Sequence, residues 1–403
     1  MPPQPPIAPR GLIALLAAVT ATGPLAMQIF LPALPAVQAD FGADVGTVQL
    51  TLSLSMVAIA LSTLAYGPLS DRHGRRPVLG AGLVLFLLGT LICAFAPGIG
   101  VLIFGRIVQA AGGAAGMVLA RAVVRDLYGA ERATGVIAQL TMVMVVAPMV
   151  APAIGGVLTD LFAWRAVFAF AALAGVLIAF WVALKLPESH VDRGRGEGAG
   201  DLLRGFALLL GSPRFCGYVG QTAFSSAIFF SFISGAPYLM VNTLGRPATE
   251  YGLWFVAVSA GFMTGNFLAI RTSGRFPQLA LMLTGSLVGL FGILLIVAIV
   301  LSGHLSPPAL FLPAGLAMVG SGLAMPNAQA GAINVFPRKA GTASGFSGFA
   351  QMTVAAIATQ AVGVLQNGTA WPMLAFMTCG AVGALASITV VWRAERARPG
   401  VVR

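Results

Sequence analysis

Twelve apolar segments, each long enough to cross a lipid bilayer, constrain what this chain can fold into. A membrane-spanning helix needs about 20 mostly apolar residues. The limits we expect are 11–37, 46–66, 78–96, 98–120, 134–158, 164–185, 215–241, 250–270, 278–301, 308–330, 341–366 and 370–392. Of all 403 residues, 58% are hydrophobic and only 9% are charged, which excludes a soluble globular protein. The sequence therefore predicts an all-α membrane protein with twelve transmembrane helices.

The basic residues predict how the chain is oriented in the membrane. A net charge of +11 can indicate a nucleic-acid partner, but these residues lie between apolar segments rather than on one polar domain. With both termini inside, only Arg165 and Arg246 of the 23 Lys and Arg fall in outside loops, and Arg106 falls within a span. Basic residues are retained on the cytoplasmic side. We therefore expect cytoplasmic termini and no nucleic-acid partner.

A long polar stretch divides the chain into two halves of six spans each. Its glycines and mixed charges are typical of a flexible linker. G-R-R-P at Gly74–Pro77 recurs as G-R-F-P at Gly274–Pro277, in the equivalent loop of the second half. The expected divisions are a cytoplasmic tail over 1–10, a six-helix bundle over 11–186, a cytoplasmic linker over 187–204, a six-helix bundle over 205–393 and a cytoplasmic tail over 394–403. The two bundles are expected to be pseudo-symmetric.

A charged run between the second and third spans carries a recognisable motif. Gly67–Pro77 reads G-P-L-S-D-R-H-G-R-R-P and is expected to be a short loop. Gly67 and Gly74 would let the backbone turn tightly, and Pro77 would open the next helix. The run resembles the loop between helices two and three of the major facilitator superfamily, whose pattern is G-x-x-x-D-R-x-G-R-R/K. The resemblance implies the major facilitator fold.

Arg106 is the one charge placed deep in the hydrocarbon region, about 12 Å into its span at ~1.5 Å per residue. Such a charge is costly unless it is paired or faces water, so it is a functional hypothesis. Gln109 shares its helix face. L-x-x-x-R-x-x-Q at Leu102–Gln109 resembles the fourth-helix motif of drug:proton antiporters, which implies that the arginine faces the cavity and helps proton transfer. The alternative is an arginine that anchors helices through backbone carbonyls.

The fifth span contains A-P-M-V-A-P-A-I-G-G, in which two prolines would bend the helix. Its paired glycines would allow close helix approach. The run resembles the antiporter motif of exporters in the superfamily, with alanine at 151 where the usual pattern has glycine. Ordinary small-residue packing is the alternative. The residues of this predicted bend are Pro148, Pro152, Gly155 and Gly156.

Charged residues near the cytoplasmic ends of spans two to four form a candidate conformational latch. They are Asp71, Arg72, Arg75 and Asp126. In related transporters the equivalent acid–base–acid group latches the two halves together in the outward-open state, with the loop aspartate facing the start of helix eleven, here near Ala340–Thr342. The alternative is a set of surface charges that satisfy one another and contribute little.

The first span relates the chain to a narrower group. Gln28–Pro35 reads Q-I-F-L-P-A-L-P and resembles the D-M/I-Y-L-P-x-x-P run of Bcr/CflA-type multidrug and phenicol exporters. Phe336–Ser344 and the last two spans also resemble them. Gln28 replaces the membrane aspartate of that group. A buried carboxylate with a raised pKa can take and release a proton, whereas glutamine only forms hydrogen bonds.

Several uncharged side chains are candidates for contacting a substrate. Span seven alternates phenylalanine with serine, which suits apolar drugs, although lipid-facing phenylalanines are an equal alternative. The residues expected to serve substrate binding or coupling are Gln28, Arg106, Gln109, Gln221, Phe224 and Gln351. Further polar candidates within spans are Gln49, Asn266, Asn327 and Gln329.

These observations predict a secondary active transporter that exports small amphipathic drugs or metabolites by alternating access, with the family's proton-linked antiport. A facilitator or importer of a small metabolite is the alternative. A polytopic membrane enzyme is disfavoured, because the three histidines are scattered in predicted loops and no acid pair is buried. We expect a monomer in the bacterial inner membrane. Its partners would be a small-molecule substrate, protons and the lipid bilayer, with no cofactor and no metal.

Overall fold

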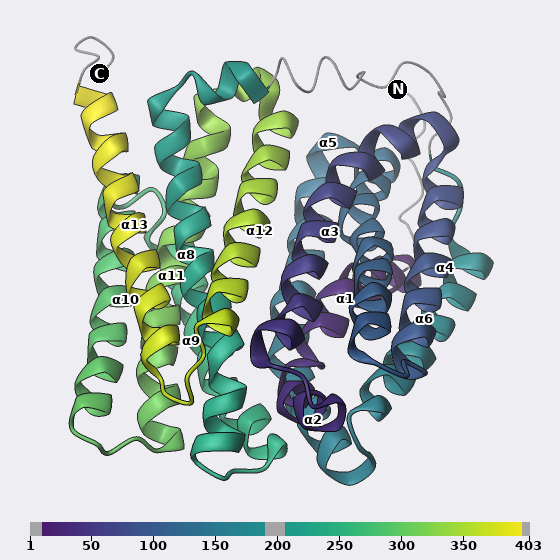
Figure 1. Cartoon of the computed structure of the whole chain (residues 1–403). Helices are drawn as coiled ribbons and strands as arrows, with labels where there is room; N and C mark the ends of the chain where they lie inside the picture. The colour runs from purple at the N-terminus through teal and green to yellow at the C-terminus, as the bar shows by residue number, and fades with distance from the viewer. Residues whose placement is uncertain (1–9, 190–205, 397–403) are drawn as a thin grey trace, which may run out of the picture. The chain divides into compact units, whose positions relative to one another are not determined.

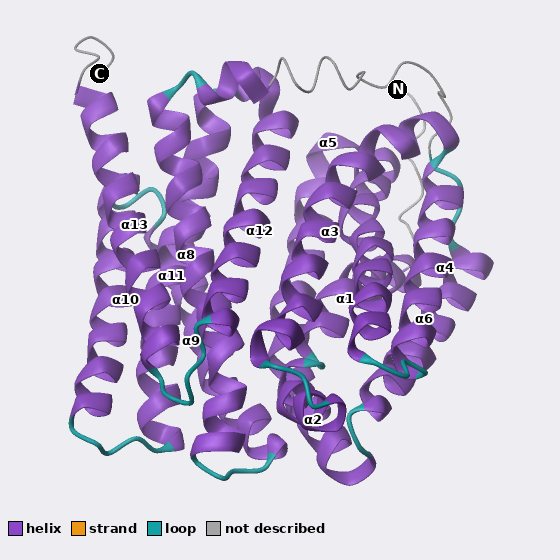
Figure 2. Cartoon of the chain, viewed as in Figure 1, coloured by secondary structure: helices purple, strands orange, loops and turns teal. Residues whose placement is uncertain are grey.

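The computed structural model describes residues 10–189 and 206–396, and every regular element in these two stretches is helical (Figure 2). Most of the predicted tails and of the predicted linker lies outside the described residues, but the inner ends of both predicted tails, residue 10 and residues 394–396, are helical. For residues 10, 129–135, 138, 141–143, 145–148 and 338 the structure describes the backbone but not the side chain. The predicted all-α fold class is confirmed.

The chain separates into two compact units (Figure 1). Unit 1 comprises Met1–Asp44 with Leu50–Gly198, and unit 2 comprises Val45–Gln49 with Ala199–Arg403. The helices of unit 1 are α1 (Arg10–Gln28), η1 (Leu31–Ala33), α2 (Leu34–Phe41), α3 (Val45–His73, with its first residues in unit 2), α4 (Arg75–Ala94), α5 (Ile99–Phe162) and α6 (Arg165–Lys185). Helix α5 packs against both α1 and α4, and α6 packs against α4.

Helix α5 includes both the fourth and the fifth predicted spans, with no non-helical residue between them. It nevertheless doubles back on itself. Arg121 Nη2 lies 3.6 Å from the Met144 sulfur, although these residues would be about 35 Å apart along a straight helix. The fourth and fifth predicted spans are thus two arms of one folded-back helix, and the loop expected between them is wrong, because helical backbone continues through it.

The first predicted span is present as one apolar stretch, Gly11–Phe41, but its α-helix is interrupted. Helix α1 ends at Gln28, and the chain resumes as the short helices η1 and α2. Pro32 and Pro35 have no backbone N–H, so the carbonyl groups four residues before them lose their helical donors. This is the physical reason for the break, and it lies beside the predicted cavity residue Gln28.

The loop predicted over Gly67–Pro77 is wrong in its extent. Helix α3 continues through Gly67 and Pro68 to His73, and α4 begins at Arg75. Gly74 alone separates them, with a positive φ of 97° that favours glycine. The charged motif is therefore carried by two helix ends, which fix its side chains more firmly than a loop would.

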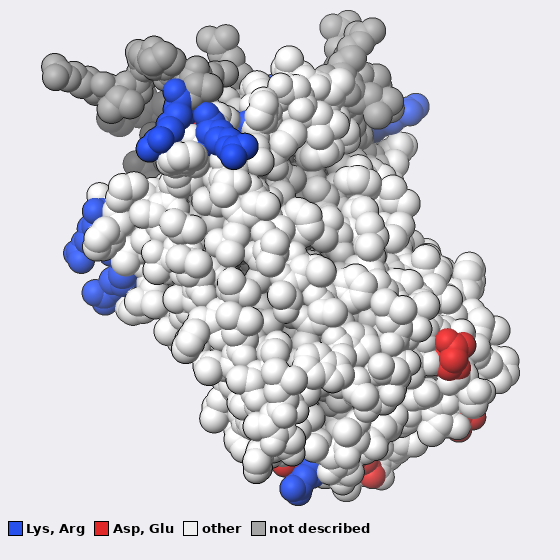
Figure 3. Space-filling model, turned by 60° about the vertical axis from the view of Figure 1, so that its left-hand side comes forward, with Lys and Arg blue, Asp and Glu red and all other residues white. Residues whose placement is uncertain are grey.

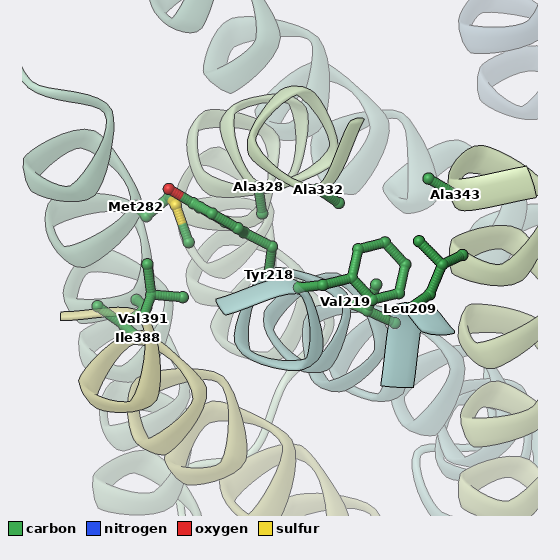
Figure 4. Packing of buried hydrophobic residues seen from close by; sticks show 10 residues of the cluster. Leu209, Tyr218, Val219, Met282, Ala328, Ala332, Ala343, Ile388 and Val391 are labelled. Carbon is green, nitrogen blue, oxygen red and sulfur yellow. The ribbon is translucent and has the colours of Figure 1, made fainter. Parts of the chain in front are cut away.

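Unit 2 is built from a second set of long helices. They are α8 (Pro213–Tyr238), η2 (Leu239–Thr243), α9 (Ala248–Thr272), α10 (Gln278–Leu301), α11 (Pro307–Val335), η3 (Pro337–Lys339), α12 (Ala340–Val364) and α13 (Trp371–Arg396). Helix α8 packs against α12 and α13, and α11 packs against α9 and α10. Figure 4 shows one buried cluster of this unit, in which Tyr218 of α8 lies among Met282, Ala328 and Val391 from three other helices.

The helices match the twelve predicted membrane segments. Within the described residues, ten helical stretches are long and apolar enough to cross a membrane, and the last part of α5, Met149–Phe162, is a shorter apolar stretch. Helix α12 adds 25 residues at the position of the eleventh segment. On the face in Figure 3, charged side chains gather towards the two ends and the band between them is almost free of charge.

Candidate functional site

Arg106 is buried in unit 1, with only 2% of its surface exposed. Its Nη1 donates hydrogen bonds to the Ala26 carbonyl at 3.1 Å and to Gln109 Oε1 at 2.6 Å. Its guanidinium carbon lies 4.8 Å from the centre of the Phe30 ring. None of the ion pairs found among the described residues includes Arg106. The positive charge is therefore stabilised by a carbonyl, an amide and an aromatic face rather than by a carboxylate.

Gln109 connects Arg106 to helix α4. Its Nε2 donates to Thr90 Oγ1 at 2.8 Å, and Thr90 Oγ1 donates to the Phe86 carbonyl at 2.7 Å. This chain of hydrogen bonds fixes both ends of the Gln109 amide, so its oxygen faces the guanidinium. The structure thus brings together Arg106 and Gln109, the pair expected from their spacing.

A small cavity lies beside Arg106. Its volume is about 10 Å³, and its lining includes Met27, Ser55 and Ile59 as well as Arg106 and Gln109. A cavity of this size is at the lower limit for one water molecule. Arg106 Nε is buried and has no hydrogen-bond partner among the described residues. The site therefore keeps one donor available for an acceptor atom.

The break in the first span supplies two of the groups around Arg106, namely the Ala26 carbonyl and the Phe30 ring. Gln28, at the end of α1, is 6% exposed. Its Oε1 is buried without a hydrogen-bond partner among the described residues. Gln28, the predicted polar contact, thus has a buried amide whose oxygen accepts no hydrogen bond from the described residues. It lies two residues from both Ala26 and Phe30, which contact Arg106.

The proline–glycine segment of α5 approaches the same break. A Cβ atom at Gly155 would overlap the Ile29 carbonyl oxygen and lie 3.1 Å from the Pro32 ring. Pro152 and Gly156 are also buried, while the side chain of Pro148 lies outside the described part. Close packing of α5 on the broken span therefore requires glycine at 155. The antiporter role of this segment stays a prediction.

Three of the four predicted latch residues form one charged cluster at the α3–α4 junction. Arg75 Nη1 lies 2.5 Å from Asp71 Oδ1, and Arg75 Nε lies 3.0 Å from Asp126 Oδ2. Arg75 also donates to Ser70 Oγ at 2.5 Å. The fourth predicted residue, Arg72, is exposed. Since the Arg75 side chain is only 10% exposed, this cluster is more than a set of solvated charges.

Two residues that the sequence analysis assigned to the linker belong to this cluster. Glu188 accepts hydrogen bonds from the backbone of Arg75 and Arg76, and Ser189 donates to Asp126 Oδ2 at 3.2 Å. Composition alone placed them in a flexible stretch. The available signal was a carboxylate directly after the sixth span, opposite in charge to the arginines of the motif.

A second polar cluster lies at the opposite end of unit 1. Asp40 Oδ2 accepts from Trp164 Nε1 at 3.0 Å and from Arg165 Nη1 at 2.9 Å. From Trp164 a series of aromatic contacts runs inwards through Phe168 to Phe30, with ring centres 6.1 Å and 5.3 Å apart. Because Phe30 also faces Arg106, the contacts are continuous from Asp40 to the buried guanidinium.

The predicted contacts in unit 2 are more dispersed. Gln221 is fully buried and donates to Ser225 Oγ at 3.0 Å, leaving its Oε1 without a partner among the described residues. Phe224 is 38% exposed, and its ring packs where a Cβ at Gly383 of α13 would sit. Gln351 is half-buried on α12. Their roles in substrate binding stay predictions.

Comparison with known proteins gives a consistent assignment. The sequence profile of the Major Facilitator Superfamily matches residues 16–359. The chain is 31% identical to Multidrug resistance protein D of Escherichia coli over 84% of each chain. It is 30% identical to a Chloramphenicol resistance protein of Pseudomonas aeruginosa, over 87% of this chain and 84% of that protein. It is 29% identical to a Bicyclomycin resistance protein homolog of Haemophilus influenzae, over 90% of this chain and 92% of that protein.

Solved structures share the fold. A bacterial homolog of the human lysosomal transporter Spinster superposes with a TM-score of 0.71 at 17% identity, covering 96% of this chain and 95% of that one. The xylose transporter XylE of Escherichia coli superposes with a TM-score of 0.72 at 14% identity, covering 95% and 97%. At these identities the likeness establishes the fold alone.

Proposed function

Because this chain belongs to the Major Facilitator Superfamily, we propose that it exports small neutral or anionic amphipathic molecules by alternating access. Members of this family are multi-pass membrane transporters, and the relatives named for resistance to multiple drugs, chloramphenicol and bicyclomycin support an efflux role. We further propose that the chain has no enzymatic activity, acts as a monomer and keeps both termini in the cytoplasm.

The observation that carries the substrate class is the buried Arg106 charge without a carboxylate partner. A cationic drug needs a negative contact to offset its desolvation. The groups around Arg106 offer donors and neutral amides instead, and Gln28 stands where the exporters that the Gln28–Pro35 run resembles commonly have an aspartate. A carbonyl, nitro or carboxylate oxygen of a substrate is the kind of atom that Arg106 Nε would bind.

Gln28 also bears on how transport is driven. With glutamine at this position, no carboxylate in the first span can take up a proton. We propose that the chain keeps the family's proton-linked antiport with a proton carrier outside the first span, and that substrate affinity itself changes little between about pH 6 and 8.

The proposal is tested by expression in an efflux-deficient bacterial host. We expect resistance to chloramphenicol to rise and its accumulation to fall, with the effect abolished by a protonophore. Susceptibility to a quaternary ammonium compound should not change. Strong export of the quaternary ammonium compound would contradict the charge argument, and increased accumulation of a metabolite on expression would favour the importer alternative.

A further inference from the structure

The first turn of α4 is capped by a residue 113 positions away in the sequence. Glu188 Oε1 accepts the Arg75 backbone N–H at 2.9 Å, and Glu188 Oε2 accepts the Arg76 N–H at 3.3 Å. The first backbone amides of a helix have no partner within the helix and attract negative charge. The carboxylate therefore accepts hydrogen bonds from two of these amides and interacts favourably with the positive end of the helix dipole.

Gly74 makes this contact possible in two ways. Its φ of 97° turns the chain sharply enough to direct the next two amides towards Glu188. A Cβ atom at this position would also lie only 2.6 Å from Glu188 Oε2. The glycine of the motif thus leaves space for the carboxylate as well as permitting the turn.

The contact is reciprocal between two helices. Arg76 Nη2 donates to the Ala183 carbonyl at 2.7 Å, in the last turn of α6. Each helix end therefore receives, from the other, a charge that complements its dipole. Beside this pair, Ser189 Oγ donates to Asp126 Oδ2 at 3.2 Å. Two hydrogen bonds accepted by Glu188 and one donated by Ser189 therefore fix the segment that follows α6 to the charged cluster.

We propose that Glu188 is a positioning residue for Arg75. The backbone amide of Arg75 is held by Glu188, while its guanidinium contacts Asp71, Ser70 and Asp126. The carboxylate fixes where α4 begins and hence where the guanidinium lies between its two acids. The chain that leads from unit 1 towards unit 2 therefore starts as part of the charged cluster. This inference rests on the proposed function only for its consequence in transport.

The first test measures hydrogen exchange of the backbone amides in the first turn of α4, using the purified full-length protein. We compare Glu188→Ala and Glu188→Gln, with Glu197→Ala as the control, since Glu197 is the same residue type nine positions further along. We expect exchange to be about tenfold faster in Glu188→Ala, because two amides lose a charged acceptor. It should be intermediate in Glu188→Gln and unchanged in the control.

The second test asks whether the effect passes through Arg75. We combine Glu188→Ala with Asp126→Asn and measure initial export rates at matched amounts of folded protein. A positioning role predicts that the loss in the double variant is smaller than the product of the two single losses. Unchanged exchange in Glu188→Ala, or independent losses, would overturn the inference. Absence of export by the unmodified protein would instead refute the proposed function, while the exchange result still decides the role of Glu188.

Discussion

Replacing Arg106 with methionine separates a ligand contact from a purely structural arginine. Methionine fills a similar volume but removes the charge and all donors. The change deletes two hydrogen bonds, to the Ala26 carbonyl and to Gln109, each worth about 1.5–3 kcal/mol for a charged donor. It also removes an unpaired buried charge, whose burial costs several kcal/mol. Since these terms oppose each other, we expect the free energy of unfolding to change by only about 1 kcal/mol.

Substrate binding should respond very differently. If Arg106 Nε donates to an acceptor atom of the substrate, Arg106→Met removes about 1.5–3 kcal/mol of binding free energy. At 1.4 kcal/mol per tenfold, the dissociation constant should rise about 10- to 100-fold. Arg106→Lys keeps the charge without the planar fork, so it should recover only part of this loss.

The assay is equilibrium binding of chloramphenicol to purified protein, alongside a thermal unfolding curve for each variant. Arg393→Met, which removes an exposed arginine from α13 in unit 2, is the matched control and should bind as the unmodified protein does. A dissociation constant that stays the same in a folded Arg106→Met protein would refute the reasoning. The arginine would then only hold α1 against α5.

Four further predictions follow from the same structure. Gln28→Asp should weaken the binding of neutral or anionic substrates as pH rises through the pKa of the new carboxyl group, because the ionised acid competes for Arg106. A dissociation constant that does not change with pH would show that position 28 does not face the site. Asp71→Asn should lower export at unchanged protein level, since Arg75 loses the negative charge that lies 2.5 Å from its Nη1, and unchanged export would show that this ion pair has no role in transport. Gly74→Ala should destabilise the protein by about 1–3 kcal/mol in a denaturation curve, through its positive φ and the clash with Glu188. In intact cells, a cysteine at Gly303 should react with an impermeant thiol reagent and one at Gly198 should not, and the reverse pattern would contradict the proposed orientation.

The parts of the site that sequence could predict are those in which one residue conflicts with its surroundings. Arg106 is a charge in an apolar segment, and Gln109 lies on its helix face, so their pairing follows from helical spacing alone. The latch acids around Arg75 followed from a short motif and a helix end. In each case the contacting residues are either a few positions apart in the sequence or belong to a recognised motif.

The parts that were missed depend on long-range contacts or on indirect backbone effects. Glu188 lies in a polar stretch whose composition indicates a linker, and nothing local shows that its partners are amides 112 and 113 positions earlier. The break after Gln28 arises because Pro32 and Pro35 have no N–H group to donate to the carbonyls four residues before them. The apolar composition of the segment, taken alone, predicts a continuous helix. The charges of the Gly67–Pro77 motif suggested a loop, whereas they occupy two helix ends.

The aromatic series between Asp40 and Arg106 has a consequence for how resistance evolves. Trp164, Phe168 and Phe30 form an unbroken path of contacts from a partly exposed ion pair to the buried guanidinium. A substitution that moves Phe168 would shift Phe30, and with it the surroundings of Arg106, the proposed substrate contact. Selection for a changed drug spectrum therefore has targets that never touch the drug. A change at Asp40 or Arg165, at the partly exposed end of the series, would therefore alter the surroundings of Arg106 from a distance.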